Sequence, residues 1–264
     1  RASCRKRERM KLTFLGTGTS QGVPVIGCEC EVCQSEDTKD QRLRTAAMIE
    51  LNQSTIVFDT GPDFRQQMLL AKVKEVSAIL FTHEHKDHVA GLDDVRAFNF
   101  RSKLPMPIYC TEQVHESLKQ EYKYIFDDQY SYPGIPKIQA NIIQNKPFIV
   151  DDIEVLPIQV WHYKLPVFGY RIKDVAYITD ANRIEETEKE KLKGLKVLVV
   201  NALRKEEHIS HFNLKQAIEL ATELQAEQTY FTHMSHLMGK HASIDDELPP
   251  NISLAYDGLE ICIR

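Results

Sequence analysis

Hydrophobic residues recur along this chain with two different periods. Short apolar runs rich in β-branched residues predict buried strands, whereas apolar positions that repeat every three or four residues predict helices. The predicted strands are 11–15, 46–51, 54–59, 76–82, 107–110, 153–160, 167–172, 175–179, 196–201, 228–232, 252–256 and 259–263. The predicted helices are 62–71, 88–100, 112–125, 183–193 and 213–225. This mixture indicates an α/β chain that buries two sheets.

Turn residues predict how some of these elements are connected. Short polar links join two pairs of strands, which are therefore predicted to be hairpins: 46–51 with 54–59, and 167–172 with 175–179. Asp257-Gly258 is a strong turn signal and predicts that the last two strands also form a hairpin. Asn213 and Gln216 are spaced as a capping box at the start of the last helix.

The length and charge of the chain limit its class. A chain of 264 residues with 42% hydrophobic content fits one globular domain, predicted to span 10–264. The basic segment Arg1–Arg9 is interpreted as a disordered extension, with a tail that binds nucleic acid or an anionic surface as the alternative. The net charge of −5 indicates no general nucleic-acid surface. No apolar run approaches the ~20 residues of a membrane span, so we expect a soluble protein.

A polar sequence of unusual composition follows the apolar run 76–81. Its residues His83, His85, Asp87 and His88 read HxHxDH and concentrate three imidazoles and one carboxylate in six positions. Such ligands suit zinc, manganese or iron(II). Four such ligands within six residues are more than one ion can conveniently bind from a single loop. His83 and His85 can therefore hold one ion while Asp87 and His88 hold a second.

Three further polar residues each close a later apolar run. His162 follows 153–160, Asp180 follows 175–179 and His233 follows 228–232. They can meet the histidine loop at one edge of a sheet. The chain at this point resembles the metallo-β-lactamase superfamily, whose ligands are HxHxDH, His, Asp and His in that order.

That resemblance implies a fold and a division of the ligands. The fold would be a four-layer αββα sandwich with two mixed sheets flanked by helices. The implied ligands are His83, His85 and His162 for one divalent ion (zinc or manganese), Asp87, His88 and His233 for a second, and Asp180 bridging both.

Cys28, Cys30 and Cys33 form a CxCx2C cluster that suggests a separate site. No signal peptide is visible, so reduced thiols and a cytoplasmic location are expected. A tetrahedral zinc needs a fourth ligand, and His236 is the candidate. The pattern resembles PhnP-type cyclic phosphodiesterases, which carry a structural zinc on three cysteines and one histidine. Packed free cysteines or a redox switch are the alternatives.

A histidine that is not a metal ligand is predicted to act beside the metals. His211 precedes a helix N-cap, and its placement resembles the non-ligand catalytic histidine of PhnP and RNase Z proteins. It can donate a proton or bind phosphate, and His208 competes for this role. Asp87 is predicted to be a catalytic residue as well as a metal ligand. Asp59 either orients a ligand imidazole or only forms a turn.

Two other segments have open roles. Residues 16–22 read GxGxxxG without the lysine of a P-loop, so they are interpreted as a turn passing near the metal site. The aromatic stretch 122–132 is either a lid over the substrate or core packing.

The resemblance implies a dinuclear phosphodiesterase that opens a small cyclic phosphate, such as 5-phosphoribosyl 1,2-cyclic phosphate, by attack of a metal-bridging hydroxide. The expected partner is a small phosphodiester, in a chain that can be a homodimer, without nucleic acid or membrane. An RNase Z-type RNA endonuclease and a non-catalytic metal-binding protein are the alternatives.

Overall fold

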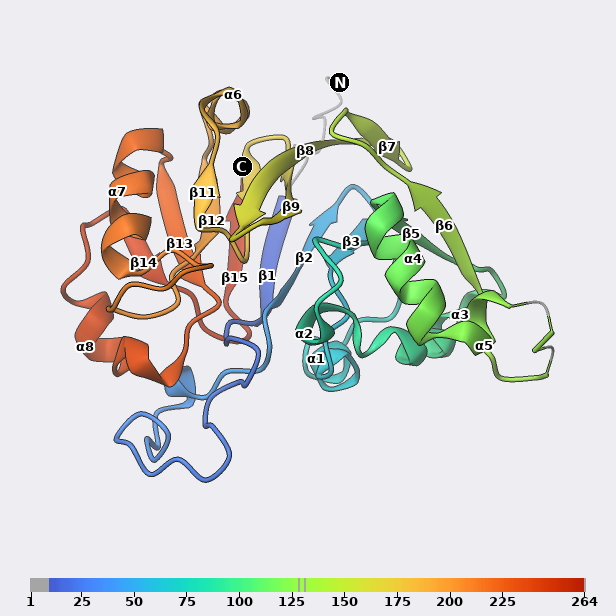
Figure 1. Ribbon diagram of the computed structural model, residues 1–264, viewed down its shortest axis with the longest axis horizontal. Helices are drawn as coiled ribbons and strands as arrows, with labels where there is room; N and C mark the ends of the chain where they lie inside the picture. The colour runs from blue at the N-terminus through green and yellow to red at the C-terminus, as the bar shows by residue number, and fades with distance from the viewer. Residues whose placement is uncertain (1–9, 128, 131, 264) are drawn as a thin grey trace, which may run out of the picture.

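The chain folds into two β-sheets packed face to face, with helices on the outer face of each (Figure 1). The computed structural model describes residues 10–127, 129–130 and 132–263. The segment Arg1–Arg9, predicted to be an extension, lies outside these residues. The four layers confirm the predicted fold class.

The first sheet is mixed, with parallel pairing from β3 through β6 and antiparallel pairing elsewhere. Its strands, in spatial order, are β15 (Glu260–Ile263), β1 (Met10–Gly16), β2 (Ala46–Leu51), β3 (Ser54–Phe58), β4 (Ala78–Leu80), β5 (Met106–Cys110) and β6 (Ile138–Ile142).

The second sheet is also mixed, with β10, β12, β13 and β14 running parallel. Its strands, in spatial order, are β11 (Arg183–Ile184), β8 (Ile153–His162), β9 (Leu165–Ile172), β10 (Val175–Tyr177), β12 (Val197–Asn201), β13 (Gln228–Thr232) and β14 (Ile252–Leu254), with β7 (Phe148–Val150) paired to β8. The antiparallel β2–β3 and β9–β10 pairs confirm two predicted hairpins.

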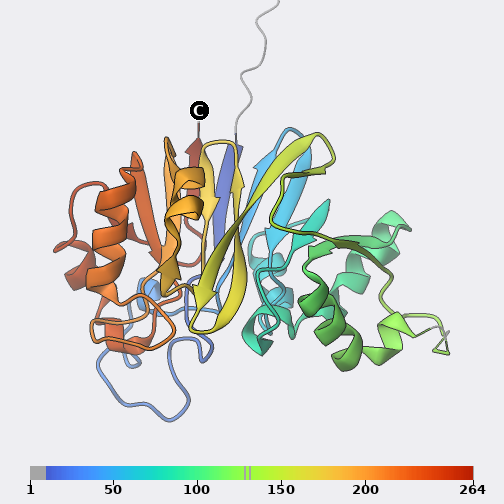
Figure 2. The same cartoon turned by 45° about the horizontal axis from the view of Figure 1, so that its top comes forward.

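Helices connect the strands and cover the sheets. The α-helices are α1 (Phe64–Leu70), α2 (Lys86–Val89), α3 (Arg96–Ser102), α4 (Glu112–Glu121), α5 (Lys123–Phe126), α6 (Glu186–Lys189), α7 (Leu214–Leu224) and α8 (His241–Asp245). The 3-10 helices are η1 (Thr38–Asp40), η2 (Leu92–Val95), η3 (Glu190–Leu192) and η4 (His236–Met238). Both views show α7 outside the second sheet and α4 outside the first (Figure 1, Figure 2). Within the described ranges, no helix is both long and apolar enough to cross a bilayer.

Three buried hydrophobic clusters fill the spaces between the four layers. The central cluster joins the two sheets, where the Phe58 ring stacks on Tyr177 at 4.7 Å between centroids. A second cluster packs α1 and α4 on the first sheet, and a third packs α7 and α8 on the second. Because each sheet is covered on both faces, central strands such as β4 and β10 are buried at every position.

The predicted hairpin at Asp257-Gly258 is wrong. β14 pairs in parallel with β13, whereas β15 pairs with β1 in the other sheet. The Asp257 carboxylate accepts hydrogen bonds from Thr17 Oγ1 (2.8 Å) and Leu43 N (2.7 Å). These contacts hold the turn against the first sheet as the chain crosses over from the second.

Three predicted helices are also interrupted, and the simplest case is 112–125, which divides at Tyr122 into α4 and α5. Helix 88–100 breaks at Gly91, whose amide donates to Thr60 O at 2.7 Å and whose position leaves no room for a Cβ. Helix 183–193 begins as a strand instead, because Arg183 and Ile184 pair with β8. The capping box at the start of α7 is confirmed, with both of its hydrogen bonds present.

Candidate metal centre

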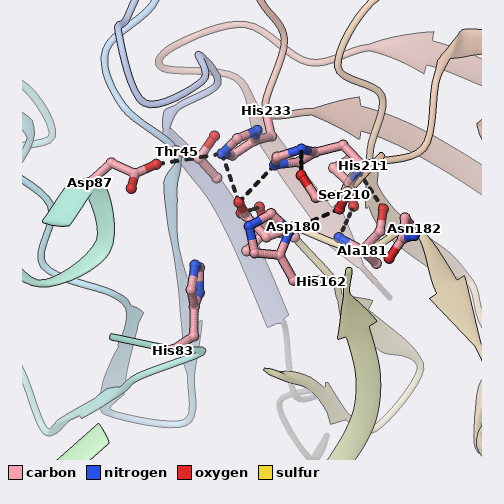
Figure 3. A network of polar contacts seen from close by, with 12 residues as sticks. Thr45, His83, Asp87, His162, Asp180, Ala181, Asn182, Ser210, His211 and His233 are labelled. Carbon is pink, nitrogen blue, oxygen red and sulfur yellow. Dashed lines mark hydrogen bonds and ion pairs between the residues drawn. The ribbon is translucent and has the colours of Figure 1, made fainter. Parts of the chain in front are cut away.

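The predicted ligands lie where strands end at one edge of the sandwich (Figure 3). Asp59 follows β3, Asp180 comes shortly after β10 and His233 follows β13. All three have left-handed backbones, with φ of 64°, 54° and 58°. Non-glycine residues seldom adopt this conformation, and it concentrates at functional sites. Here it turns the chain sharply at the strand end and directs the side chain into the site.

The histidine loop packs closely on the turn after β3. Thr60 N donates to His88 O at 2.7 Å. A Cβ on Gly61 would lie 2.2 Å from Asp87 O, and one on Gly91 would lie 2.2 Å from Gly61 O. These two glycines therefore permit the backbone approach that positions the loop.

One group of predicted ligands is made of imidazoles. His83, His85 and His162 each offer a ligand atom, and these atoms lie within 4.8 Å of one another. His162 Nδ1 donates to Ser210 O at 2.8 Å, which leaves Nε2 as the ligand atom. His83 Nε2 is buried and has no hydrogen-bond partner.

A neighbouring group contains Asp87, His88, Asp180 and His233, again within 4.8 Å. Asp180 lies between two imidazoles: its Oδ2 is 3.2 Å from His88 Nε2, and its Oδ1 is 3.2 Å from His233 Nε2. Figure 3 shows that Asp87 and Asp180 approach His233 from different directions, with Asp87 Oδ2 at 3.6 Å from His233 Nε2.

The completely buried Asp59 orients His88. Its Oδ2 accepts from His88 Nδ1 at 2.7 Å, and the carboxylate also accepts from the amide and hydroxyl of Thr82, each at 2.8 Å. Asp59 therefore has both of the roles expected for it: it orients an imidazole and it forms a turn.

Burial and charge oppose each other in this centre. Burial alone lowers the pKa of His88, but the carboxylates of Asp180, Asp87 and Asp59 outweigh it, and the net pKa lies well above the ordinary value. Burial raises the pKa of Asp180, but His233 and His88 hold the net value well below the usual range. The site thus stabilises carboxylates in their charged, metal-binding form.

The donor set fits two divalent ions. Among the described residues, the buried Nε2 atoms of His83, His88 and His233 form no hydrogen bond of good geometry, although Asp180 lies 3.2 Å from the latter two, and this is unusual for buried polar atoms. Imidazole and carboxylate ligands suit zinc or manganese. The structure thus brings the seven predicted residues together in two adjoining groups, and their metal binding stays a prediction.

The cysteine cluster makes a separate, closed group. His236 Nδ1 lies 3.3 Å from the sulfurs of Cys28 and Cys30 and 3.5 Å from that of Cys33. The sulfur–nitrogen edge of a tetrahedral zinc site is about 3.5 Å, from Zn–S of about 2.3 Å and Zn–N of about 2.0 Å. A backbone hydrogen bond from Cys33 lowers the pKa of Cys30 to about 6, whereas burial raises the pKa of Cys33 to about 11, so the distances rather than the pKa values support a metal site here. The four donors therefore fit one zinc ion.

The glycine-rich segment 16–22 links the two sites. Thr19 N donates to Met234 O at 3.0 Å, and Met234 N donates to Thr17 O at 2.9 Å. Since Met234 is the residue between His233 and the loop to His236, this segment ties the cysteine-bearing chain to a predicted ligand. The turn predicted from GxGxxxG therefore does pass beside the centre.

His211 contacts the centre directly. Its Nε2 lies 3.0 Å from Asp180 Oδ1, and its Nδ1 lies 3.0 Å from Ser210 Oγ and 3.1 Å from His208 Nδ1. His211 also groups with His162 and Asp180 within 4.8 Å. Its imidazole can therefore face the reacting atoms, with His208 one step further from the centre.

Two asparagines of the centre were not predicted from the sequence. Asn201, completely buried at the end of β12, donates to Ala181 O at 2.9 Å and accepts from Ala181 N at 2.7 Å. It fixes the turn after Asp180. Asn182 contacts two further loops of the site. Asn201 closes an apolar run as the ligands do, so the same signal could have found it.

The aromatic stretch has a structural part. Tyr122 OH donates to Val89 O at 2.9 Å, and Tyr124 OH donates to Asp93, so both side chains pack against the segment that follows the histidine loop. Tyr130 and Tyr132 are exposed. The lid stays a prediction.

The chain is similar to known proteins in both sequence and structure. The model of the beta-lactamase superfamily domain matches residues 54–234. A solved structure described as a new diphosphatase from the PhnP family is 38% identical, covers 97% of both chains and has a TM-score of 0.91.

Curated relatives are longer. The octanoyltransferase of Porphyromonas gingivalis is 39% identical over 257 residues, or 96% of this chain and 52% of that protein. A ribonuclease Z of an Exiguobacterium species is 29% identical over 165 residues, or 62% of this chain and 48% of that protein. The chain thus spans about half the length of the curated relatives it matches.

Proposed function

Because the chain belongs to the beta-lactamase superfamily and, within it, to the PhnP family, we propose that it is a dinuclear metal-dependent phosphodiesterase. The proposal depends on one observation: Asp180 lies close to both ligand groups, because its carboxylate is within 4.8 Å of the His162 ligand atom in the first group and 3.2 Å from His88 and His233 in the second. A carboxylate in that position can contact both ions.

Each ligand group has a role in this proposal. The first ion would be held by His83, His85 and His162, and the second by Asp87, His88 and His233, with Asp180 shared. Two bound ions would supply Lewis acidity to a phosphoryl oxygen and lower the pKa of the attacking water. Asp59 and Ser210 O orient His88 and His162, so these imidazoles present Nε2 without rearrangement.

His211 supplies the remaining chemistry. Its Nε2 points to Asp180 beside both ligand groups, within reach of a phosphoryl group bound there. An N–H at this atom can donate a proton to the leaving oxygen or a hydrogen bond to a phosphoryl oxygen. Ser210 Oγ and His208 contact the other ring nitrogen and orient the imidazole.

The substrate class is a small cyclic phosphate diester, such as 5-phosphoribosyl 1,2-cyclic phosphate. The net charge of −5 argues against a large nucleic-acid surface. We place the protein in the cytoplasm in this proposal, where cysteines stay reduced for metal binding. The cysteine group would hold one structural zinc.

A second candidate is hydrolysis of a diphosphate link. The observation that favours it is the solved relative at 38% identity, which is described as a diphosphatase. The same constellation suits both reactions, because each displaces an oxygen leaving group from a disubstituted phosphoryl centre.

A substrate panel tests the proposal. Steady-state rates would be measured at fixed zinc or manganese on ribose cyclic phosphate, cyclic nucleotides, bis(p-nitrophenyl) phosphate, a nucleoside diphosphate ester and precursor tRNA, with p-nitrophenyl phosphate, a thioester and a β-lactam for comparison. We expect the rates on the diesters to exceed the rate on p-nitrophenyl phosphate. Asp180→Asn should lose activity on all of these substrates. Faster cleavage of the diphosphate ester would favour the second candidate. Efficient thioester or β-lactam hydrolysis without diesterase activity would refute both.

A further inference from the structure

Asn182 connects its own loop to two other segments of the centre. Its backbone N donates to Trp161 O at 2.8 Å, and its Oδ1 accepts from Tyr163 N at 2.8 Å. It therefore holds both chain neighbours of His162. Its Nδ2 donates to Ile209 O at 3.0 Å, in the loop that carries His211. Figure 3 shows Asn182 beside Ser210, on the far side of Asp180 from Asp87.

The chemistry of these contacts specifies asparagine. One partner of the side chain is a donor and the other is an acceptor, so the amide needs both its oxygen and its nitrogen in a fixed orientation. Aspartate keeps the acceptor but lacks the donor, and alanine lacks both.

The loop that bears His211 depends on polar contacts of this kind. Its base is closed by Leu203 N to Phe212 O (2.9 Å) and by Phe212 N to Ala181 O (2.7 Å). The Ile209 side chain is 65% exposed, so hydrophobic burial does little to hold this part of the loop. At the two residues before His211, the carbonyl of Ile209 accepts from Asn182 and that of Ser210 from His162, while Arg204 donates to Glu207 O earlier in the loop.

The hairpin that bears His162 also needs support. Tyr163 has a left-handed backbone with φ of 58°, a conformation that costs a non-glycine residue free energy. The Asn182 acceptor satisfies the Tyr163 amide in that conformation. Its loss would let the backbone relax next to a predicted ligand.

We infer that Asn182 is a positioning residue that fixes His162 and His211 relative to each other. Its Oδ1 sets the ligand geometry of His162 through Tyr163, and its Nδ2 sets the placement of His211 through Ile209. The kinetic part of this inference rests on the proposed function, whereas the structural part does not.

Two variants separate the two atoms. Asn182→Ala removes both contacts, and Asn182→Asp retains only the acceptor. Asn141→Ala is the matched control, because Asn141 also donates from Nδ2 to a backbone carbonyl, Ile108 O, but from β6. All three would be measured as full-length, metal-loaded protein after thermal melting shows that they are folded.

Hydrogen exchange measured by mass spectrometry reports the loop without reference to activity. Exchange of the amides in 208–212 should accelerate roughly fivefold in both Asn182 variants, the effect of losing about 1 kcal/mol of one hydrogen bond. Competition with a chelator should show roughly fivefold weaker metal binding in Asn182→Ala but no weakening in Asn182→Asp. Asn141→Ala should match the wild type in both measurements.

Kinetics then tests action through His211. Each Asn182 variant should lower kcat roughly tenfold with little change in KM, because a displaced catalytic group loses transition-state contact. In a His211→Ala background, Asn182→Asp should lower kcat by less than about twofold, because the His211 imidazole through which Asn182 acts is absent.

Unchanged exchange of 208–212 in both variants would overturn the inference. So would an equal loss of rate from Asn182→Asp with and without His211, because that result indicates general damage. If the wild type hydrolyses no diester or diphosphate, the proposed function fails, while the exchange and chelator measurements still decide the role of Asn182.

Discussion

At the scale of single residues, the contacts of His211 are compatible with two roles, that of a catalytic group beside the metals and that of a metal ligand. The Nε2 atom lies 3.0 Å from Asp180 Oδ1, so it can face a substrate bound at the ligand groups. It also groups with His162 and Asp180 within 4.8 Å, as a ligand would. A non-ligand role predicts that removal of the imidazole changes the rate and leaves metal content unchanged.

We therefore expect His211→Ala to retain metal and thermal stability but to lose roughly 10²–10⁴-fold in rate, the usual effect of removing a general acid or base. The loss should be smaller for p-nitrophenolate, which needs no proton, than for a ribose alkoxide. Rates on both esters and elemental analysis would be measured. An equal loss on both leaving groups would make His211 a phosphate binder, and a fall in metal content would make it a ligand.

A second residue, His241, predicts a pH effect on stability away from the centre. Its Nδ1 accepts from the buried Arg42 guanidinium at 3.1 Å, which requires a neutral ring. Burial, reinforced by the charge of Arg42, lowers the pKa of His241 to about 4, and Lys39 also lowers it while Asp245 and Asp40 oppose it. The unfolded chain, with a pKa near 6.5, therefore binds more protons between those values.

The free energy of unfolding should accordingly include a His241 contribution that is intact above pH 6.5 and is lost as the pH falls toward 4. The partly buried Asp257, whose pKa desolvation raises to about 6, acts in the opposite direction below that pH. The difference between wild type and His241→Gln isolates the histidine. Urea unfolding at several pH values should show this difference shrinking as the pH falls. A difference that stays constant with pH would contradict it.

At the scale of elements, the ligands could be predicted because each follows an apolar run, as His83, Asp180 and His233 do. A strand buried on both faces leaves a strong apolar signal, and the polar residues that follow it lie at the sheet edge, where they can meet ligands from other strands. The helix cap at Asn213 could be predicted for the same reason, since capping depends on local hydrogen bonds.

Elements that depend on distant contacts could not be predicted in this way. β6 pairs only with β5 at the sheet edge and is partly exposed, so Ile138–Ile142 has no long apolar run. The break at Gly91 results from packing on Thr60 and Gly61, which no local pattern encodes. Asn182 was missed because its partners come from two other loops.

The turn after β3 predicts a steric effect on the histidine loop. Gly61→Ala would place a Cβ 2.2 Å from Asp87 O, a distance that requires the loop to shift. We expect a loss of roughly 1–3 kcal/mol in the free energy of unfolding, together with lower metal content. Ala90→Ser, an exposed change at the end of α2, is the control. Normal metal content and stability in Gly61→Ala would show that the loop tolerates displacement.

At the scale of the whole molecule, the centre is built from both halves of the sandwich. The histidine loop extends from β4 in the first sheet, whereas His162, Asp180 and His233 come from the second. The central hydrophobic cluster sets the distance between these two sets. The ligands therefore converge only when the sheets are packed, so metal binding is linked to folding.

The three ligand groups determine how many ions the molecule should hold and the order in which it should lose them. The three ligand groups should bring protein purified without chelator close to about three metals per chain: about two in the His/Asp groups and about one in the cysteine group. Mild chelation should remove the pair first, because a site that keeps an open position for substrate exchanges more readily than a closed tetrahedral one.

The cysteine group gives the matched test. Cys33→Ser should lose about one metal, lower the melting temperature and reduce the rate, because Thr19 and Met234 connect that loop to the backbone beside His233. Cys262→Ser, an exposed cysteine outside the group, should change none of these properties. A loaded protein with a single ion would refute the dinuclear centre. A Cys33 variant that loses its metal but keeps wild-type stability and rate would show that the two sites are independent, despite the hydrogen bonds that join their loops.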